Sequence, residues 1–126
     1  MAAGYSTALR NAQLDAITTA VGNAGKLALY DGTRPATGGA ATTKLAEFTL
    51  GSPFAPGAAA GVLSPTLPAD TTGLAAGTAT WGRITTSGGT FVIDLGVGTD
   101  ITLNTTTVSV GVTCSVTSFS ITRGNA

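Results

Sequence analysis

The chain has 126 residues, a length typical of one domain, and its six acidic residues balance its six lysines and arginines. It contains no histidine and one cysteine, and only 10% of its residues are charged, against about a quarter in ordinary domains. Acid–base catalysis draws on titratable side chains, so this composition predicts a structural or binding protein and not an enzyme, with no cofactor and no metal. The cations are scattered along the chain, which argues against a nucleic-acid partner.

Threonine, alanine and glycine together make up half of the chain. Threonine favours strands and glycine favours tight turns, so few long helices are expected. The low charge leaves little electrostatic repulsion between copies, which favours self-association. The lone Cys114 cannot close an intrachain disulfide, and we expect it to be buried as a small hydrophobic side chain.

The N-terminal region is expected to form a short arm over residues 1–5 and a helix over about residues 7–21. Ser6 is a suitable N-cap, and Gly22 is a suitable end. The apolar side of this helix should lie against a sheet or a partner, while Asn11 and Asp15 occupy the other side. The first cation is Arg10 and no long apolar run is present, so we expect neither a signal peptide nor a membrane span, and synthesis in a cytosol.

After this helix the hydrophobic pattern changes to period two, which is typical of strands. Strands are expected over residues 26–30 and 44–50, separated by a polar loop that begins with Asp31-Gly32. In the second strand Leu45, Glu47 and Thr49 alternate with the residues of the opposite face. Four of the five prolines lie between residues 51 and 70, so we expect a loop there with a short edge strand at Val62-Leu63.

A hairpin is expected between residues 77–86 and 90–95, which are separated by glycines. A two-residue turn at Gly88-Gly89 places Arg83 opposite Asp94, as a cross-strand ion pair, and puts Ile84 opposite Ile93 on the apolar face. The alternative turn, Ser87-Gly88, would place Arg83 opposite Val92.

The last third is expected to contain strands over residues 101–103 and within 107–122. Apolar side chains alternate regularly up to Val116, and the phase then shifts, which requires either a bulge at Thr117-Ser118 or a turn at Gly111. Many short strands and one helix predict a mainly β fold, a β-sandwich or a jelly-roll-like barrel, with residues 6–126 as one domain.

Few side chains are candidates for a site. Asp94 and Asp100 bracket a loop that could bind a hard cation, although ordinary turn chemistry explains it better. Arg34 follows Asp31-Gly32 and is either a recognition residue or a solvated side chain. Trp81 shares a strand face with Arg83, and this face either points outward or lies under the N-terminal helix. Trp81 is therefore either an interface anchor or a core residue.

The order of several segments along the chain is similar to that of a known class of proteins. The alanine-rich helix is followed by KLALYDGTRP (26–35), LAEF (45–48), GTATWGR (77–83) and DLGVG (94–98). Over nearly the whole chain this order resembles small β-rich virion proteins of tailed bacteriophages, some of which are decoration or cement proteins that clamp neighbouring capsid subunits. The resemblance implies a location on the capsid exterior after synthesis in the host cytoplasm, and no catalysis.

Partners follow from the resemblance and from the low charge. We expect contact with the major capsid protein and with copies of the chain itself, as a homodimer or a homotrimer. Four side chains are the candidate contacts: Tyr5 in the arm, Arg34, Trp81 and Arg83. The alternative is a host-recognition or carbohydrate-binding domain of a phage tail or fibre, with Trp81 or Tyr30 stacking on sugar rings.

Overall fold

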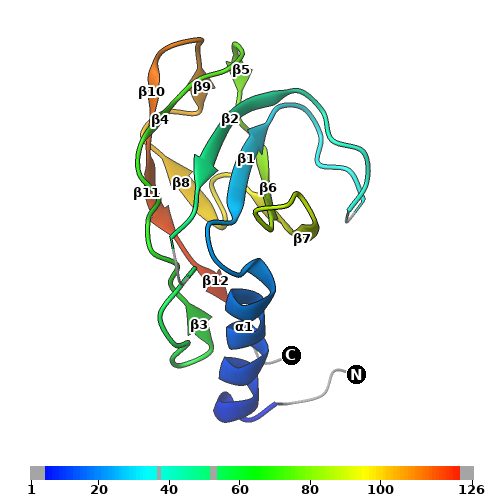
Figure 1. The fold of residues 1–126 in the computed structure, drawn as a ribbon, viewed down its shortest axis with the longest axis vertical. Helices are drawn as coiled ribbons and strands as arrows, with labels where there is room; N and C mark the ends of the chain where they lie inside the picture. The colour runs from blue at the N-terminus through cyan, green and yellow to red at the C-terminus, as the bar shows by residue number, and fades with distance from the viewer. Residues whose placement is uncertain (1–4, 37, 52–53, 123–126) are drawn as a thin grey trace.

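The computed structural model describes residues 5–36, 38–51 and 54–122, and over these residues the predicted mainly β fold with one N-terminal helix is confirmed (Figure 1). None of the described residues forms a helix long and apolar enough to cross a membrane. The elements in chain order are α1 (Thr7–Val21), β1 (Lys26–Tyr30), β2 (Lys44–Thr49), β3 (Val62–Leu63), β4 (Thr71–Thr72), β5 (Gly77–Thr78), β6 (Trp81–Thr85), β7 (Phe91–Gly96), β8 (Ile101–Leu103), β9 (Thr107–Val108), β10 (Thr113–Cys114), β11 (Val116–Phe119) and β12 (Ile121–Thr122).

Helix α1 begins and ends at the predicted residues. The Ser6 hydroxyl accepts a hydrogen bond from the Leu9 N–H at 3.1 Å, which satisfies one of the free amides of the first turn. At the other end the Gly22 N–H donates to the Thr18 carbonyl at 3.2 Å. Leu14 and Val21 are buried against the rest of the fold, as the apolar side predicts.

The polar side of α1 also makes hydrogen bonds to the rest of the fold. Asn11 Oδ1 accepts a hydrogen bond from the Gly61 N–H at 2.9 Å, and Asp15 Oδ1 accepts one from the Ala58 N–H at 2.8 Å. Both donors lie in the segment before β3, so the two side chains fasten this segment to the helix. The predicted short strand at Val62–Leu63 is confirmed and pairs with β12.

The largest sheet has four antiparallel strands in the order β2-β1-β6-β7. The other strands form antiparallel pairs, β11 with β8, β10 with β4, β12 with β3 and β5 with β9. The main core lies between one face of the large sheet, the helix and these pairs. Its fully buried members include Leu14, Leu27, Leu29, Phe48, Phe54, Leu63, Ile84, Ile101 and Val108.

A bulge changes the face on which one residue of β2 lies. The partners shift between Leu29 and Tyr30, because Leu29 pairs with Ala46 while Tyr30 pairs with Lys44. Leu45 is the extra residue, and its side chain is fully buried in the main core. The prediction that Leu45 shares a face with Glu47 is therefore wrong, since a regular alternation cannot include the bulge.

The β6–β7 hairpin has the predicted pairs but a different turn. Arg83 pairs with Asp94 and Ile84 pairs with Ile93, but the register then shifts, so Thr85 pairs with Phe91. Hydrogen bonds from Thr86 N–H to the Thr90 carbonyl and from Gly89 N–H to the Thr86 carbonyl, both 2.9 Å, close a three-residue turn. Gly89 adopts a φ of 93°, which favours glycine. The prediction of a two-residue turn was thus wrong. The shift between Ile84 and Thr85 is a bulge, and it restores the predicted pairs of Arg83 with Asp94 and of Ile84 with Ile93.

Both devices considered for the last third are present. The β8–β11 register shifts between Val116 and Ser118, which leaves Thr117 as a bulge. A turn also interrupts the alternation earlier, since the Val112 N–H donates to the Ser109 carbonyl at 3.1 Å. The turn leaves Val110 and Val112 exposed at 69% and 52%.

Candidate functional site

The outward face of the large sheet carries most of the candidate residues. Trp81 and Arg83 lie on the face opposite Ile84, as predicted. The cover over this face is the β1–β2 connection, residues 31–36 and 38–43, which we call the covering loop. Helix α1 does not lie over this face, because its buried residues Leu14 and Val21 belong to the main core on the opposite face. Of the two alternatives for Trp81 and Arg83, a position under the N-terminal helix is therefore wrong.

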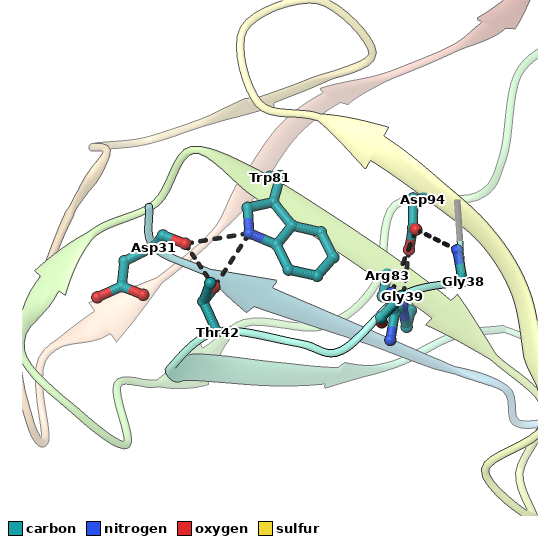
Figure 2. Close-up of polar contacts among 7 residues, drawn as sticks. All are labelled: Asp31, Gly38, Gly39, Thr42, Trp81, Arg83 and Asp94. Atoms are coloured by element: carbon teal, nitrogen blue, oxygen red, sulfur yellow. Dashed lines mark hydrogen bonds and ion pairs between the residues drawn. The ribbon is translucent and has the colours of Figure 1, made fainter. Parts of the chain in front are cut away.

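Trp81 is held beneath the covering loop and is only 1% exposed. Its indole Nε1 donates to the Asp31 carbonyl at 3.0 Å and to Thr42 Oγ1 at 3.1 Å, which are the two ends of the loop (Figure 2). The Tyr30 ring stacks on the indole with centroids 4.5 Å apart. Of the two alternatives for Trp81, burial is what the structure shows, and the exposed interface anchor is not.

Arg83 and Asp94 form a buried ion pair next to Trp81. Arg83 Nε lies 2.7 Å from Asp94 Oδ1, and the side chains are only 13% and 2% exposed. A second guanidinium nitrogen, Nη2, donates to Asp94 Oδ2 at 3.2 Å and to the Gly39 carbonyl at 2.7 Å, while the Gly38 N–H donates to Asp94 Oδ2 at 3.0 Å (Figure 2). The pair therefore fastens the tip of the covering loop to the sheet.

The protonation of this pair follows from its contacts. Burial raises the pKa of the Asp94 carboxyl, but hydrogen bonds from Arg83 and the Gly38 N–H outweigh it, and the pKa lies below its ordinary value. The hydrogen bond to Asp94 raises the pKa of Arg83. The guanidinium also lies 5.2 Å from the ring centroids of both Trp81 and Phe91, within the range of cation–π contacts.

Beside the covering loop, the same face is hollowed into a pocket of about 420 Å³. Ala28 lies at its centre, because its small side chain separates Lys26 from Tyr30 along β1 and Glu47 from Arg83 across the strands. We call this the basic pocket. It is lined by Lys26, Ala28, Tyr30, Lys44, Glu47, Arg83, Thr85, Ser87, Gly88 and Gly89.

The remaining candidates are placed apart from one another. Arg34 is exposed in the covering loop, and its charge also lowers the pKa of Asp94. Tyr5 is half-buried just before α1, whose first turn is the end of the helix farthest from the large sheet (Figure 1). The structure thus groups Arg34, Trp81 and Arg83, while Tyr5 is separate. Residues 1–4 of the predicted arm lie outside the described residues.

The carboxylates of the 94–100 loop bind protein groups. Asp94 is paired with Arg83, and Asp100 Oδ2 accepts a hydrogen bond from the Gly96 N–H at 3.0 Å. Within the described ranges no three His, Cys, Asp or Glu side chains come close enough together to hold a metal ion. The Asp100 contact is turn chemistry of the kind that the sequence favoured, whereas Asp94 binds Arg83 and the Gly38 N–H outside this loop.

A second surface feature lies at the opposite end of the molecule from α1, around β4, β9 and β10 (Figure 1). Leu74, Val110 and Val112 are exposed at 58%, 69% and 52%. Their segments are adjacent, because the Gly73 N–H donates to the Val112 carbonyl at 2.9 Å and the Gly111 N–H donates to the Gly73 carbonyl at 3.0 Å. We call these three side chains the apolar end.

Sequence reasoning missed the basic pocket and the apolar end. The period-two placement of Lys26, Ala28 and Tyr30 on one face of β1 was a usable signal for the pocket, because Arg83 was already expected on a sheet face. The apolar end had no such signal, since it depends on a turn that places two valines outside the core. Comparisons with known proteins add no relative, because no protein family, curated protein or solved structure matches the chain.

Proposed function

We propose that the protein is a structural virion protein, a decoration or cement protein that binds the outside of a phage head and stabilises contacts between major capsid subunits. The observation that carries the proposal is the apolar end, where three large aliphatic side chains are more than half exposed on adjacent segments. Clustered exposed apolar side chains mark sites of protein contact. The resemblance of the sequence to phage virion proteins supplies the kind of partner.

The composition of the chain supports the same function. A protein with six cations and six anions among 126 residues has little charge to oppose close packing against copies or capsid subunits. Many identical weak contacts over a shell act together through avidity, so no single contact needs to be strong. We propose that the chain acts as a homodimer or a homotrimer and that no reaction is part of its role.

The finer architecture belongs to the same proposal. The main core lies between the large sheet and the short strand pairs, which supports a β-sandwich with α1 at one end. A sandwich of this kind leaves the loops at both ends available for contacts, and the apolar end is formed by such loops.

Particle stability tests the function directly. Phage capsids with and without the protein should be heated while light scattering follows their integrity, and we expect the decorated capsids to survive to a higher temperature. Leu74→Ala should reduce occupancy on the capsids, whereas Leu9→Ala should not, because Leu9 is 45% exposed on α1, away from the apolar end. Equal thermal stability of bare and decorated capsids would overturn the cement function.

The alternative function is recognition of a host carbohydrate by a tail or fibre domain. It requires an exposed ring for stacking, but Trp81 is 1% and Tyr30 is 8% exposed, and the two rings stack on each other. The basic pocket is the one observation that favours it, because polar side chains line a hollow of sugar size. A glycan array separates the two functions, since a cement protein should bind assembled shells and no glycan.

A further inference from the structure

The basic pocket contains an unusual share of the charge of the chain. Three of the six cations, Lys26, Lys44 and Arg83, line one hollow. Two of them have acidic partners, since Lys44 Nζ lies 2.8 Å from Glu47 Oε2 and Arg83 is paired with Asp94. The pocket and its immediate partners therefore contain three positive and two negative groups.

Lys26 provides the uncompensated charge. Its Nζ donates to Thr49 Oγ1 at 2.8 Å, and no described carboxylate lies within ion-pair distance of it. An ammonium group has three donors, so after the bond to Thr49 two remain available to a ligand. A neutral hydroxyl partner leaves the full charge of Lys26 directed at the pocket.

The rest of the lining suits a small polar anion. Ala28 leaves room at the centre, and the polar residues Thr85 and Ser87 are part of the lining. The Ser87–Gly89 turn forms one side, where the absence of glycine side chains lets a ligand approach the backbone. The pocket is thus open, polar and singly positive, which matches a ligand with one negative charge and oxygen acceptors.

We propose that the basic pocket binds a carboxylate group carried by an acidic side chain of a protein partner. The carrier rests on the proposed function, since a protein that binds a capsid contacts other proteins. A protein source is favoured over an acidic sugar because neither Tyr30 nor Trp81 exposes a ring face for stacking. The carboxylate would contact Lys26 first and would compete with Glu47 for Lys44.

The test is a titration of the isolated ¹⁵N-labelled chain, followed by NMR, with two small probes. N-acetylglutamic acid α-amide has one side-chain carboxylate, and N-acetylglutamine α-amide is its neutral counterpart. We expect the glutamate probe to shift the amide resonances of Ala28, Thr85 and Gly88 in a saturable way, and the glutamine probe to leave them unchanged. Added salt should weaken the binding, because it screens exposed charges. Equal shifts with both probes would overturn the proposal.

Two variants with opposite expected effects keep the test decisive. Lys26→Gln should weaken binding of the glutamate probe about tenfold, the value of one charge-assisted hydrogen bond. Glu47→Gln removes the competing carboxylate and should strengthen it. Arg10→Gln is the matched control, since it removes the same charge from α1, which contributes no residue to the pocket lining, and should leave the affinity unchanged. An unchanged affinity in Lys26→Gln, or weaker binding in Glu47→Gln, would contradict the proposal.

The source of the carboxylate is tested in a third arm of the same titration. Glucuronic acid replaces the glutamate probe, and tighter binding of the sugar acid would overturn the protein source. Failure of any arm concerns the pocket alone, because the isolated chain is titrated without capsids. Decorated capsids that remain more heat-stable than bare ones would then preserve the cement function while the pocket proposal falls.

Discussion

The ion pair between Arg83 and Asp94 joins two strands and also closes a loop over them. Each partner binds the backbone of the covering loop, Arg83 at the Gly39 carbonyl and Asp94 at the Gly38 N–H. These two loop contacts connect residues more than 40 positions apart in the chain. The cross-strand pair that the sequence predicted on the face opposite Ile84 is therefore largely buried, and it holds the covering loop in place above Trp81.

Replacement of Arg83 by lysine should loosen this fastening while keeping the charge. A lysine cannot bind the carboxylate with two nitrogens and the Gly39 carbonyl at once, because its ammonium is a single point of charge. We expect Arg83→Lys to lower the free energy of unfolding by about 1–3 kcal/mol, measured by denaturant titration. Hydrogen exchange of the Gly38 amide should become faster. Arg34→Lys is the control and should change stability by less than about 0.5 kcal/mol.

The Asp94 carboxyl makes part of the stability depend on pH. Although burial raises its pKa, the hydrogen bonds from Arg83 and Gly38 lower it below the ordinary value. The ionised group therefore stabilises the fold above the unfolded pKa of about 4, and this contribution is lost as pH falls from there through the folded pKa. Below about pH 4 the free energy of unfolding should fall more steeply in the wild type than in Asp94→Asn. Parallel pH profiles for the two proteins would contradict this origin.

The hydroxyl of Thr42 should control access to the buried tryptophan. Thr42 Oγ1 donates to the Asp31 carbonyl and accepts from the Trp81 indole, so Thr42→Val removes both bonds with little change of shape. Because Trp81 is the one tryptophan in the chain, acrylamide quenching of its fluorescence reports directly on the loop. We expect weak quenching in the wild type and stronger quenching in Thr42→Val. Thr43→Val is the matched control, since Thr43 contacts Asp31 through its backbone N–H, and it should behave as the wild type.

Local signals predicted some of these features and not others. Helix α1 was predictable at both ends because its cap and its end depend on neighbouring residues, Ser6 with Leu9 and Gly22 with Thr18. The Arg83–Asp94 pair was also predictable, although through a wrong turn. A three-residue turn and a one-residue bulge shift the register by opposite amounts, so the pairs beyond them are the same.

The covering loop was not predictable, because nothing in its composition distinguishes it from a solvated loop. Its contacts join Asp31 and Thr42 to Trp81, residues that are far apart in sequence and share no periodicity. Leu45 was misplaced for a related reason, since a bulge leaves no mark in an alternating pattern. The basic pocket depends on this bulge, because the bulge brings Lys44 opposite Tyr30 on the face that carries Glu47.

Burial of Cys114 should protect its thiol from reagents. Its side chain is 2% exposed, and burial raises its pKa, so less of the reactive thiolate is present at a given pH. We expect the native protein at pH 8 to react slowly with a disulfide reagent such as 5,5′-dithiobis(2-nitrobenzoic acid), and the urea-unfolded protein to react fully within the mixing time of the assay. Rapid reaction of the native protein would contradict the buried position.

The apolar end should depend on one glycine where two segments approach closely. A Cβ at Gly73 would overlap the Ser109 carbonyl oxygen and would lie 2.8 Å from Val108 Cγ1, so Gly73→Ala must push the turn that carries Val110 away from Leu74. We expect a loss of about 1–3 kcal/mol in the free energy of unfolding and weaker binding to capsids. Gly57→Ala is the matched control, because nothing lies within 4 Å of a Cβ there, and it should be neutral or slightly stabilising. Unchanged stability of Gly73→Ala would contradict the close approach of the two segments. Wild-type binding to capsids by a destabilised Gly73→Ala would show that the arrangement of the apolar end does not matter for binding.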